Sequence, residues 1–358
     1  MIGIIFISDI KYCPYLTRYT EILDKEQIKY EVLFWNRSEN SIIHPENYLS
    51  FNFNSNLNKH PFLKLVDFLK FKNWLSKKLK NKKYEKLIIL STLSGIIISK
   101  ILKDNFKGKY IFDIRDYSYE NIGLFYLIEE TLIRNSAFTC ISSDGFKTFL
   151  PKEYSYLSVH NFNQSEIIYK RKFNKKVYGE PLNLVFIGGV RYFNHQSQII
   201  SKLKNDKRFN LTYHGSGVEL DKFISYCKSE KINNVTFTGE YNNIDKYKLL
   251  ANADILNNSY QTEKVMEVKY AISNKFYDGL IYGIPQLVES ETYKQKIVEE
   301  NYLGIGLDVN DIDFSNKLYN FYFSLDEERF NYSCDKYLEK IIEEDKLYIS
   351  KIRSFINT

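Results

Sequence analysis

From residue 182 onward the sequence runs Leu182-Asn183-Leu184-Val185-Phe186-Ile187-Gly188-Gly189-Val190-Arg191. Its first six positions form a short, mostly apolar run, and two glycines follow. Runs of the same kind recur before and after it, separated by stretches of helical length. Apolar runs without alternation indicate strands that are covered on both faces, which is typical of a parallel sheet with crossover helices.

The apolar runs fall into two series, and the second begins at Leu182 after a polar, basic stretch over 163–180. The first series comprises Met1–Ser8, Tyr30–Trp35, Lys86–Ser91, Lys109–Ile114 and Ala137–Ser142. The second comprises Leu182–Ile187, Asn210–His214, Asn234–Thr238, Ala253–Asn257 and Gln286–Glu289.

This restart predicts two Rossmann-like α/β domains that face each other across a cleft. A chain of 358 residues is also longer than one hydrophobic core usually supports. We expect an N-terminal domain over 1–165, joined by a C-terminal helix over 338–358, and a second domain over 175–337. The alternative is one long multi-stranded α/β domain.

Composition favours a cytoplasmic protein. The chain is 44% hydrophobic and 26% charged, and its four cysteines form no Cys-x-x-Cys pair, which argues against a zinc site or a disulfide framework. Met1–Ser8 lacks the basic start of a signal peptide and instead resembles a buried strand. No apolar run approaches the roughly 18 residues that a spanning helix needs.

The positive charge is confined to one segment. Nine Lys stand between His60 and Leu87 against Asp67 and Glu85, a surplus of seven, so the rest of the chain carries a net charge of −1 out of the total of +6. Nucleic-acid binders spread basic charge more widely, so we expect no nucleic-acid partner. The segment 61–83 interleaves lysines with apolar residues and Trp74. We expect it to touch an anionic membrane, or alternatively to be a core helix with a solvated basic rim.

Two short stretches have the chemistry of an anion site. Gly188 and Gly189 would let the backbone approach a bulky anion, and Arg191 offers a donor fork that suits a diphosphate. In the stretch from Ser273 to Pro285, Ser273 or Asn274 can cap a helix, with Lys275 adding a positive charge. The alternatives are a tight turn with a solvated arginine and an ordinary capped surface helix.

Asn274 and Asp278 are four residues apart on the expected helix and therefore share a face. The Asn274 amide would meet phosphate oxygens, and the Asp278 carboxylate could accept two hydrogen bonds from a vicinal diol such as ribose. Gly283 and Pro285 would end the helix.

This region resembles the Asn-Lys-x-x-Glu…Gly-x-Pro signature of retaining family 4 glycosyltransferases, which have the GT-B fold. Further stretches occur in the family's order, and the resemblance covers most of the chain. They are Phe112–Asp116, Val159–Asn161, Phe186–Gly189, Tyr213–Gly217, Asn234–Gly239 and Ala251–Leu256.

The resemblance implies transfer of a sugar, with retention, from a nucleotide diphosphate sugar. Arg191 and Lys275 would be catalytic through the leaving diphosphate. Apart from the resemblance, Asp116 stands at the end of a predicted strand, where α/β ligand sites open, and could face the acceptor hydroxyl. The residues implied in donor binding are Gly188, Gly189, Gly215, Thr238, Gly239, Asn274, Phe276 and Asp278. No cluster of His and carboxylate residues in the sequence suggests a catalytic metal, so we expect a metal-independent enzyme with no cofactor beyond the donor.

The sequence departs from the family at two positions. Asp278 stands where a Glu is usual, and Tyr270 stands where a second Glu is common. Glu267 is a possible replacement at a different spacing. In the first half, Asp113 and Asp116 flank Arg115, and the three residues could instead form a local ion pair. His160 is more simply a satisfied hydrogen-bonding residue.

We therefore expect a hexosyltransferase that favours a UDP-sugar and acts on a lipid-linked or growing bacterial surface glycan such as a capsule. One alternative is a GT-B sugar-nucleotide epimerase. Another is a non-catalytic sugar-nucleotide-binding partner subunit. Nicotinamide chemistry is disfavoured because no Gly-x-Gly-x-x-Gly follows the first strand.

Overall fold

The computed structural model describes residues 1–358 except 38–42, 56–60, 163 and 263–265. The chain divides into two compact units, the first formed by 1–161 with 343–358 and the second by 162–342. Each unit contains one parallel sheet.

The first unit has a seven-stranded sheet in the order β3-β2-β1-β4-β5-β6-β7. Every neighbouring pair is parallel. The strands are β1 (Ile2–Phe6), β2 (Tyr30–Asn36), β3 (Tyr48–Asn52), β4 (Lys86–Leu90), β5 (Tyr110–Ile114), β6 (Phe138–Ile141) and β7 (Tyr156–Ser158). The helices are α1 (Leu16–Lys25), α2 (Pro61–Asn81), α3 (Thr92–Ile97), α4 (Ser99–Asn105) and α5 (Gly123–Asn135), with short 3₁₀ turns η1 (Ile10–Tyr12) and η2 (Asp144–Thr148).

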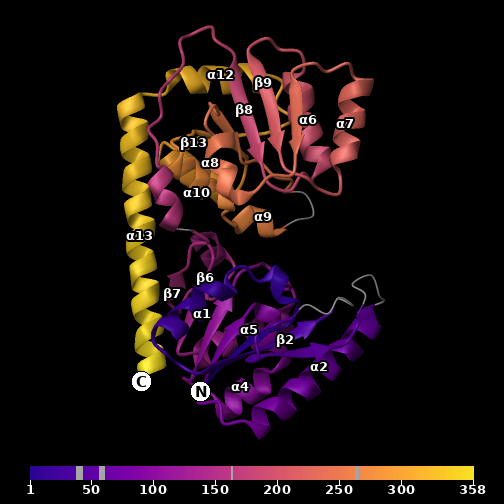
Figure 1. Ribbon diagram of the computed structural model, residues 1–358, viewed down its shortest axis with the longest axis vertical. Helices are drawn as coiled ribbons and strands as arrows, with labels where there is room; N and C mark the ends of the chain where they lie inside the picture. Colours follow the sequence, from indigo (N-terminus) through magenta and orange to yellow (C-terminus); the bar gives the residue numbers. More distant parts are fainter. Residues whose placement is uncertain (38–42, 56–60, 163, 263–265) are drawn as a thin grey trace. The chain divides into compact units, whose positions relative to one another are not determined.

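The second unit has a six-stranded parallel sheet in the order β10-β9-β8-β11-β12-β13. The strands are β8 (Leu182–Ile187), β9 (Phe209–His214), β10 (Val235–Gly239), β11 (Ile255–Asn257), β12 (Gln286–Glu289) and β13 (Gly304–Leu307). The helices are α6 (Phe193–Leu203), α7 (Leu220–Ser229), α8 (Lys246–Leu249), α9 (Met266–Tyr270), α10 (Asn274–Ile281), α11 (Tyr293–Glu300) and α12 (Phe314–Ser324), with 3₁₀ turns η3 (Gln164–Tyr169) and η4 (Asn243–Asp245). Figure 1 shows β8 and β9 running in the same direction beside α6 and α7.

Both sheets are doubly wound, because their strand order reverses next to β1 in the first unit and next to β8 in the second. All five residues of β1 are buried, as expected for a central strand with helices on both faces. In doubly wound sheets, ligands bind outside the carboxyl ends of the strands at such a reversal.

The long C-terminal helix α13 (Glu327–Asn357) contributes to both cores. Phe330 and Leu338 belong to the apolar core of the second unit. Tyr348 and Ile352 are fully buried in the core of the first unit, against residues of β1, β2 and β4. The last turns of the chain are therefore an integral part of the N-terminal unit.

Candidate functional site

The loops after β8 and β9 pack backbone against backbone. The Gly188 N–H donates to the His214 carbonyl at 2.9 Å, and the Val190 N–H donates to the Ser216 carbonyl at 3.0 Å. A Cβ added at Gly215 would lie 2.0 Å from the Gly188 carbonyl oxygen, and Gly215 has a φ of 133°. Gly215 is thus required for the close approach of the two loops.

The exposed side of the loop after β8 is open. A Cβ at Gly189 would meet nothing within 4 Å, and one at Gly188 would meet only the Lys275 Nζ, at 3.9 Å. The structure therefore brings the glycine pair and Lys275 together, although 86 residues separate Gly189 from Lys275 in the sequence. This is the edge at which a parallel sheet offers a ligand site.

Lys275 is 5% exposed, and its Nζ donates to the Tyr260 hydroxyl at 2.6 Å. The ammonium also lies 3.8 Å from the centre of the Phe186 ring. Burial, reinforced by the positive charge of Arg191, lowers the pKa of Lys275 to about 7 against the attraction of Asp278 and Glu289. No described carboxylate lies within ion-pair distance of it. A buried ammonium without an ion-pair partner is a place where an anion would be stabilised.

Arg191 is exposed, with its guanidinium 4.9 Å from the Tyr192 ring. The positive charge of Arg191 adds to the lowering of the Lys275 pKa and opposes the rise that burial causes in the Tyr260 pKa. The guanidinium therefore lies on the side of the loop that faces Lys275 and Tyr260. Tyr192 has a φ of 63° and precedes α6. The Phe193 N–H, at the start of that helix, donates to the Glu219 carboxylate at 3.0 Å. That N–H therefore already has a carboxylate partner.

Helix α10 begins at Asn274, as the sequence predicts, but Ser273 does not cap it through its side chain. Instead the Ser273 hydroxyl donates to the Asn258 amide oxygen. Asn274 is exposed, whereas Phe276 is fully buried among core rings, including those of Tyr277 and Tyr337. The Phe276 side chain thus serves the core and not the site surface, which corrects its assignment to donor binding.

Asp278 is buried and already has a cation partner. Its Oδ1 accepts from the Lys246 Nζ at 2.7 Å, and the same ammonium lies 2.6 Å from Glu166. Burial raises the pKa of Asp278, while Lys246 opposes that shift. The sequence predicts that the Asp278 carboxylate could accept two hydrogen bonds from a diol. In the structure one of its two oxygens already accepts from Lys246.

At the end of β10, the Thr238 hydroxyl lies 2.8 Å from the His214 Nδ1. Burial lowers the pKa of that histidine. Gly239 has a φ of 77° and open space beside it, and its carbonyl accepts from the Gly215 N–H at 2.8 Å. Thr238 and Gly239 therefore border the same loops as Gly188.

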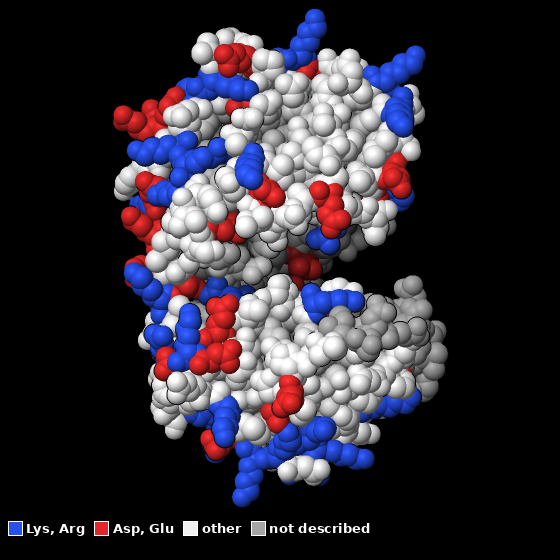
Figure 2. Space-filling view, viewed as in Figure 1, with Lys and Arg blue, Asp and Glu red and all other residues white. Residues whose placement is uncertain are grey.

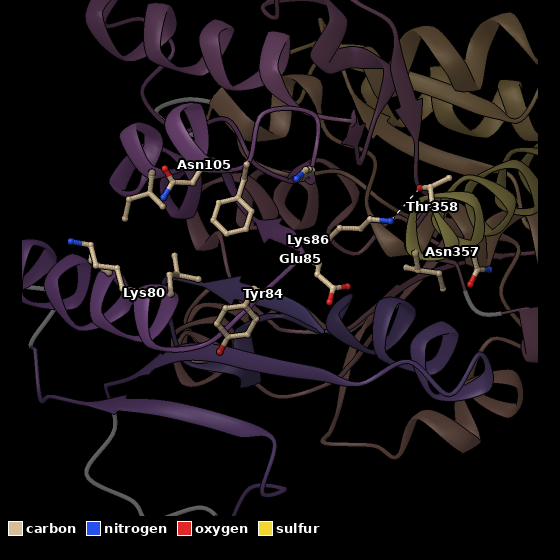
Figure 3. Close-up of a pocket in the computed structure, with 13 residues that line it drawn as sticks. Lys80, Tyr84, Glu85, Lys86, Asn105, Asn357 and Thr358 are labelled. Carbon is tan, nitrogen blue, oxygen red and sulfur yellow. Dashed lines mark hydrogen bonds between the residues drawn. The ribbon is translucent and has the colours of Figure 1, made fainter.

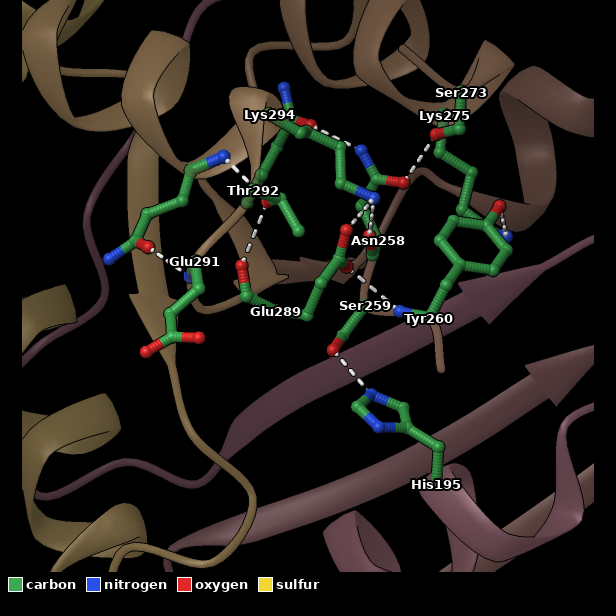
Figure 4. A network of polar contacts seen from close by, with 12 residues as sticks. His195, Asn258, Ser259, Tyr260, Ser273, Lys275, Glu289, Glu291, Thr292 and Lys294 are labelled. Atoms are coloured by element: carbon green, nitrogen blue, oxygen red, sulfur yellow. Dashed lines mark hydrogen bonds and ion pairs between the residues drawn. The ribbon is translucent and has the colours of Figure 1, made fainter. Parts of the chain in front are cut away.

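A buried polar network under the site was not predicted (Figure 4). Glu289, at the end of β12, lies 3.0 Å from the Lys294 Nζ and accepts from the Tyr260 N–H at 2.9 Å. Lys294 also donates to the Asn258 carbonyl at 2.6 Å. These contacts fix the segment that carries Tyr260, the partner of Lys275. The position of Glu289 at a strand end was the only signal in the sequence.

The sequence left open whether Glu267 or Tyr270 would contact the donor sugar. Glu267 and Tyr270 both lie in α9, where Glu267 is exposed and Tyr270 partly buried. The charge of Glu267 raises the pKa of Tyr192, which places its carboxylate near the loop after β8. The Tyr192 ring in turn contacts the Tyr260 ring edge-on, at 5.8 Å between centres.

In the first unit, Asp113 and Arg115 form a buried ion pair, with 2.7 Å between Oδ1 and Nε. Tyr19 donates to the same carboxylate at 2.6 Å. The ion-pair alternative therefore applies to these two residues, whereas Asp116 is exposed after β5. His160 pairs with Glu344 in α13, as a satisfied structural histidine does.

The basic helix α2 is a core helix. Phe71 and Leu75 are fully buried, and Trp74 stacks on Phe71 at 5.8 Å between ring centres. Trp74 is the aromatic residue that we expected at a membrane surface, so the alternative of a core helix with a solvated basic rim is favoured. Over the face shown in Figure 2, basic and acidic side chains are interspersed. No described helix is long and apolar enough to cross a bilayer.

A separate hollow of about 720 Å³ lies in the first unit near the start of β4 (Figure 3). It is lined by Lys80, Tyr84 and Lys86 among others. Lys86 donates to the Phe355 carbonyl and to the Thr358 hydroxyl at the end of α13. The hollow contains none of the predicted site residues. Its Lys86 side chain holds the C-terminal end of α13.

No family model matches the sequence. A search of curated proteins likewise finds no match. Among solved structures, the chain is similar to the apo form of the lipopolysaccharide outer core galactosyltransferase WaaB, with a TM-score of 0.69, 14% identity and 99% of each chain covered. It is also similar to sucrose-phosphate synthase from Thermosynechococcus elongatus, with a TM-score of 0.68, 12% identity and 99% of each chain covered.

A third similar structure is Anabaena HepE in complex with UDP and glucose, with a TM-score of 0.60, 13% identity and 99% of each chain covered. At these identities the likeness concerns the fold. The two parallel sheets, of seven and six strands, match those of the glycosyltransferases. The chain has the GT-B fold.

Proposed function

We propose that this chain is a sugar-nucleotide-dependent glycosyltransferase whose donor diphosphate binds at Lys275. The observation that carries the proposal is a buried ammonium beside an open glycine loop, with no carboxylate of the described residues in ion-pair distance. Positively charged groups held in a dry site stabilise a leaving diphosphate far better than they would in water. UDP-bound structures of this fold support a UDP-sugar donor.

In the proposed reaction, the bond between the sugar C1 and the β-phosphate oxygen breaks while the acceptor hydroxyl oxygen bonds to C1. The acceptor proton leaves with the diphosphate. Lys275 and Arg191 neutralise the departing charge without a metal ion, and Asp116 orients the acceptor hydroxyl. Retention of configuration is part of the proposal. So are a hexose as the transferred sugar and a lipid-linked or growing surface glycan as the acceptor.

Around the diphosphate, Gly188 and Gly189 offer open backbone, and the Asn274 amide is exposed beside Lys275. Thr238 and Gly239 would border the base, and the free oxygen of Asp278 would accept from a ribose hydroxyl. Of Glu267 and Tyr270, we favour Glu267 as the residue that contacts the sugar. Its carboxylate charge raises the pKa of Tyr192, which follows the loop after β8.

The test is calorimetry with UDP on the wild type and on Lys275→Ala and Arg191→Ala. Both variants should fold, and each should weaken binding by about tenfold or more, since each removes a charge-assisted contact. Unchanged affinity in both would remove this site assignment. Hydrolysis of the UDP-sugar without acceptor would argue against a non-catalytic partner subunit, and conversion to an epimeric sugar nucleotide would favour the epimerase.

A further inference from the structure

The short segment that follows β11 is held by hydrogen bonds from three other elements. The Lys294 ammonium, from α11, donates to the Asn258 carbonyl at 2.6 Å (Figure 4). The Gln196 amide, from α6, donates to the Ser259 carbonyl at 2.6 Å. The Tyr260 N–H donates to a carboxylate at the end of β12 at 2.9 Å. The backbone from which the Tyr260 side chain extends is therefore fixed on all these sides.

The ring of Tyr260 is also held in place. The Lys294 ammonium lies over it, 4.5 Å from the ring centre. The Tyr192 ring meets it edge-on, at 5.8 Å between centres. A cation over the ring and an edge-on aromatic contact both restrict how the ring can turn. The hydroxyl at its tip consequently has a defined position.

That hydroxyl sets where the Lys275 ammonium lies. A lysine side chain is long and flexible, so its charge occupies a fixed position only where a partner holds it. The Lys275 Nζ donates to the Tyr260 hydroxyl at 2.6 Å and lies 3.8 Å from the centre of the Phe186 ring. Of these two neutral contacts, the hydrogen bond is the directional one. It holds the ammonium beside Gly188, where an added Cβ would be 3.9 Å from the Nζ.

The same hydrogen bond bears on the charge of Lys275. Burial and the nearby Arg191 favour the neutral amine, whereas Asp278 and Glu289 favour the ammonium from further away. The remaining charged neighbour is Lys294, whose positive charge acts on the Tyr260 phenol. A hydrogen bond to the charged form of a group stabilises that form. The Tyr260 oxygen, by accepting from the ammonium, therefore adds to the forces that keep Lys275 protonated.

We propose that Tyr260 positions the Lys275 ammonium at the loop after β8, where the donor diphosphate would bind, and stabilises its charged form. The proposal rests on the proposed function and adds a residue to it. Tyr260 acts through Lys275, so it is a positioning residue and not a catalytic one. An ammonium that is already in place needs no reorganisation when negative charge develops on the leaving diphosphate.

The experiment measures UDP affinity by calorimetry at pH 6 and pH 8.5 for the wild type and Tyr260→Phe, which keeps the ring. The variant should bind more weakly, and the ratio between the two proteins should grow about fivefold or more from pH 6 to pH 8.5. The reason is that Lys275 loses its proton at lower pH in the variant. The ionisation of UDP itself cancels in this ratio.

The matched control is Tyr322→Phe, in the core of the same unit. Tyr322 is fully buried, and its hydroxyl accepts from the Lys176 N–H at 3.1 Å. This variant also loses one hydroxyl contact, but its affinity ratio to the wild type should be the same at both pH values. A second check uses Lys275→Met as the background, in which Tyr260→Phe should have no further effect on UDP affinity.

Unfolding by denaturant tests the same pair without UDP. Tyr260→Phe should destabilise the protein more at pH 6 than at pH 9, because a hydrogen bond from an ammonium is stronger than one from a neutral amine. Equal destabilisation at the two pH values would overturn the proposal. So would an affinity loss that is independent of pH, or a further loss in the Lys275→Met background. A wild type that does not bind UDP would refute the proposed function, while the unfolding data would still decide the role of Tyr260.

Discussion

The Lys275 ammonium and the Tyr260 hydroxyl lie 2.6 Å apart, so a buried cation is held by a neutral oxygen. Tyr260 is itself fixed by Glu289, which accepts from its backbone N–H at 2.9 Å. Among the described residues no carboxylate lies at ion-pair distance from the Lys275 ammonium, and Asp278 and Glu289 attract it only from further away.

We predict that UDP affinity falls as pH rises from 7.5 to 8.5. The pKa of Lys275 is lowered to about 7 by burial, and a bound diphosphate must raise it. Binding therefore takes up a proton in this window, and affinity should drop by several-fold per pH unit. Titration calorimetry in two buffers of different ionisation enthalpy measures that proton. Lys275→Arg, which stays charged, should show a flat profile; a flat profile for the wild type would contradict the assignment.

Lys275→Met should stabilise the unliganded protein while weakening UDP binding. The unfolded chain keeps the ordinary lysine pKa, so between about pH 7 and that value it binds more protons than the native protein does. Stability therefore rises with pH over this range, and the cost of the lysine is fully present below it. Denaturant unfolding should give a gain of about 1–3 kcal/mol at pH 7, shrinking by pH 9.5. A loss of stability at pH 7 would show that burying the Lys275 ammonium does not destabilise the folded protein.

Asp278→Asn should cost more affinity for UDP than for its 2′-deoxy counterpart. The carboxylate oxygen not held by Lys246 is the one expected to accept from ribose. The expected difference is about tenfold, the size of one charge-assisted hydrogen bond. Lys246→Met serves as the control, since it disturbs the same ion pair but should affect both nucleotides equally. Equal losses in Asp278→Asn would exclude the ribose contact.

Lys294→Met should destabilise the protein by about 3–5 kcal/mol, because it leaves the buried Glu289 carboxylate without its cation. Adding Glu289→Gln should recover part of this loss, since the remaining groups are then neutral. Denaturant unfolding of the two single variants and the double variant measures the coupling. Additive losses would mean that the pair does not act as a unit.

Replacing Lys77, Lys78 and Lys83 by Glu should leave vesicle binding unchanged. Lys82 is spared because it pairs with Glu31. Phe71, Leu75 and Leu79 are buried in the core, so the lysines at this end of α2 lack a hydrophobic anchor beside them. Co-sedimentation with anionic vesicles in 0.1 M salt should be equal for the two proteins. Vesicle binding by the wild type that disappears in the triple variant would restore the membrane interpretation of α2.

The sequence by itself determined the strands at the centre of each sheet. Leu182–Ile187 and Gln286–Glu289 were predicted with the bounds that the structure has, because strands buried on both faces are continuous apolar runs. The edge strands β3, β7 and β13 were missed. They are only partly buried and interrupted by polar or glycine residues, so no such run marks them.

The position of the candidate site could also be predicted, because the carboxyl ends of parallel strands meet at one edge. The hydrogen-bond and ion-pair partner of each side chain at that edge was decided by the tertiary structure. Glu219 reaches the start of α6 from 26 residues away, and Lys246 reaches Asp278 from 32. Such pairs have no fixed spacing along the chain, since loop lengths and sheet order bring them together. Periodicity therefore predicts elements, whereas the partners of Lys275, Asp278 and Phe276 follow only from the packed fold.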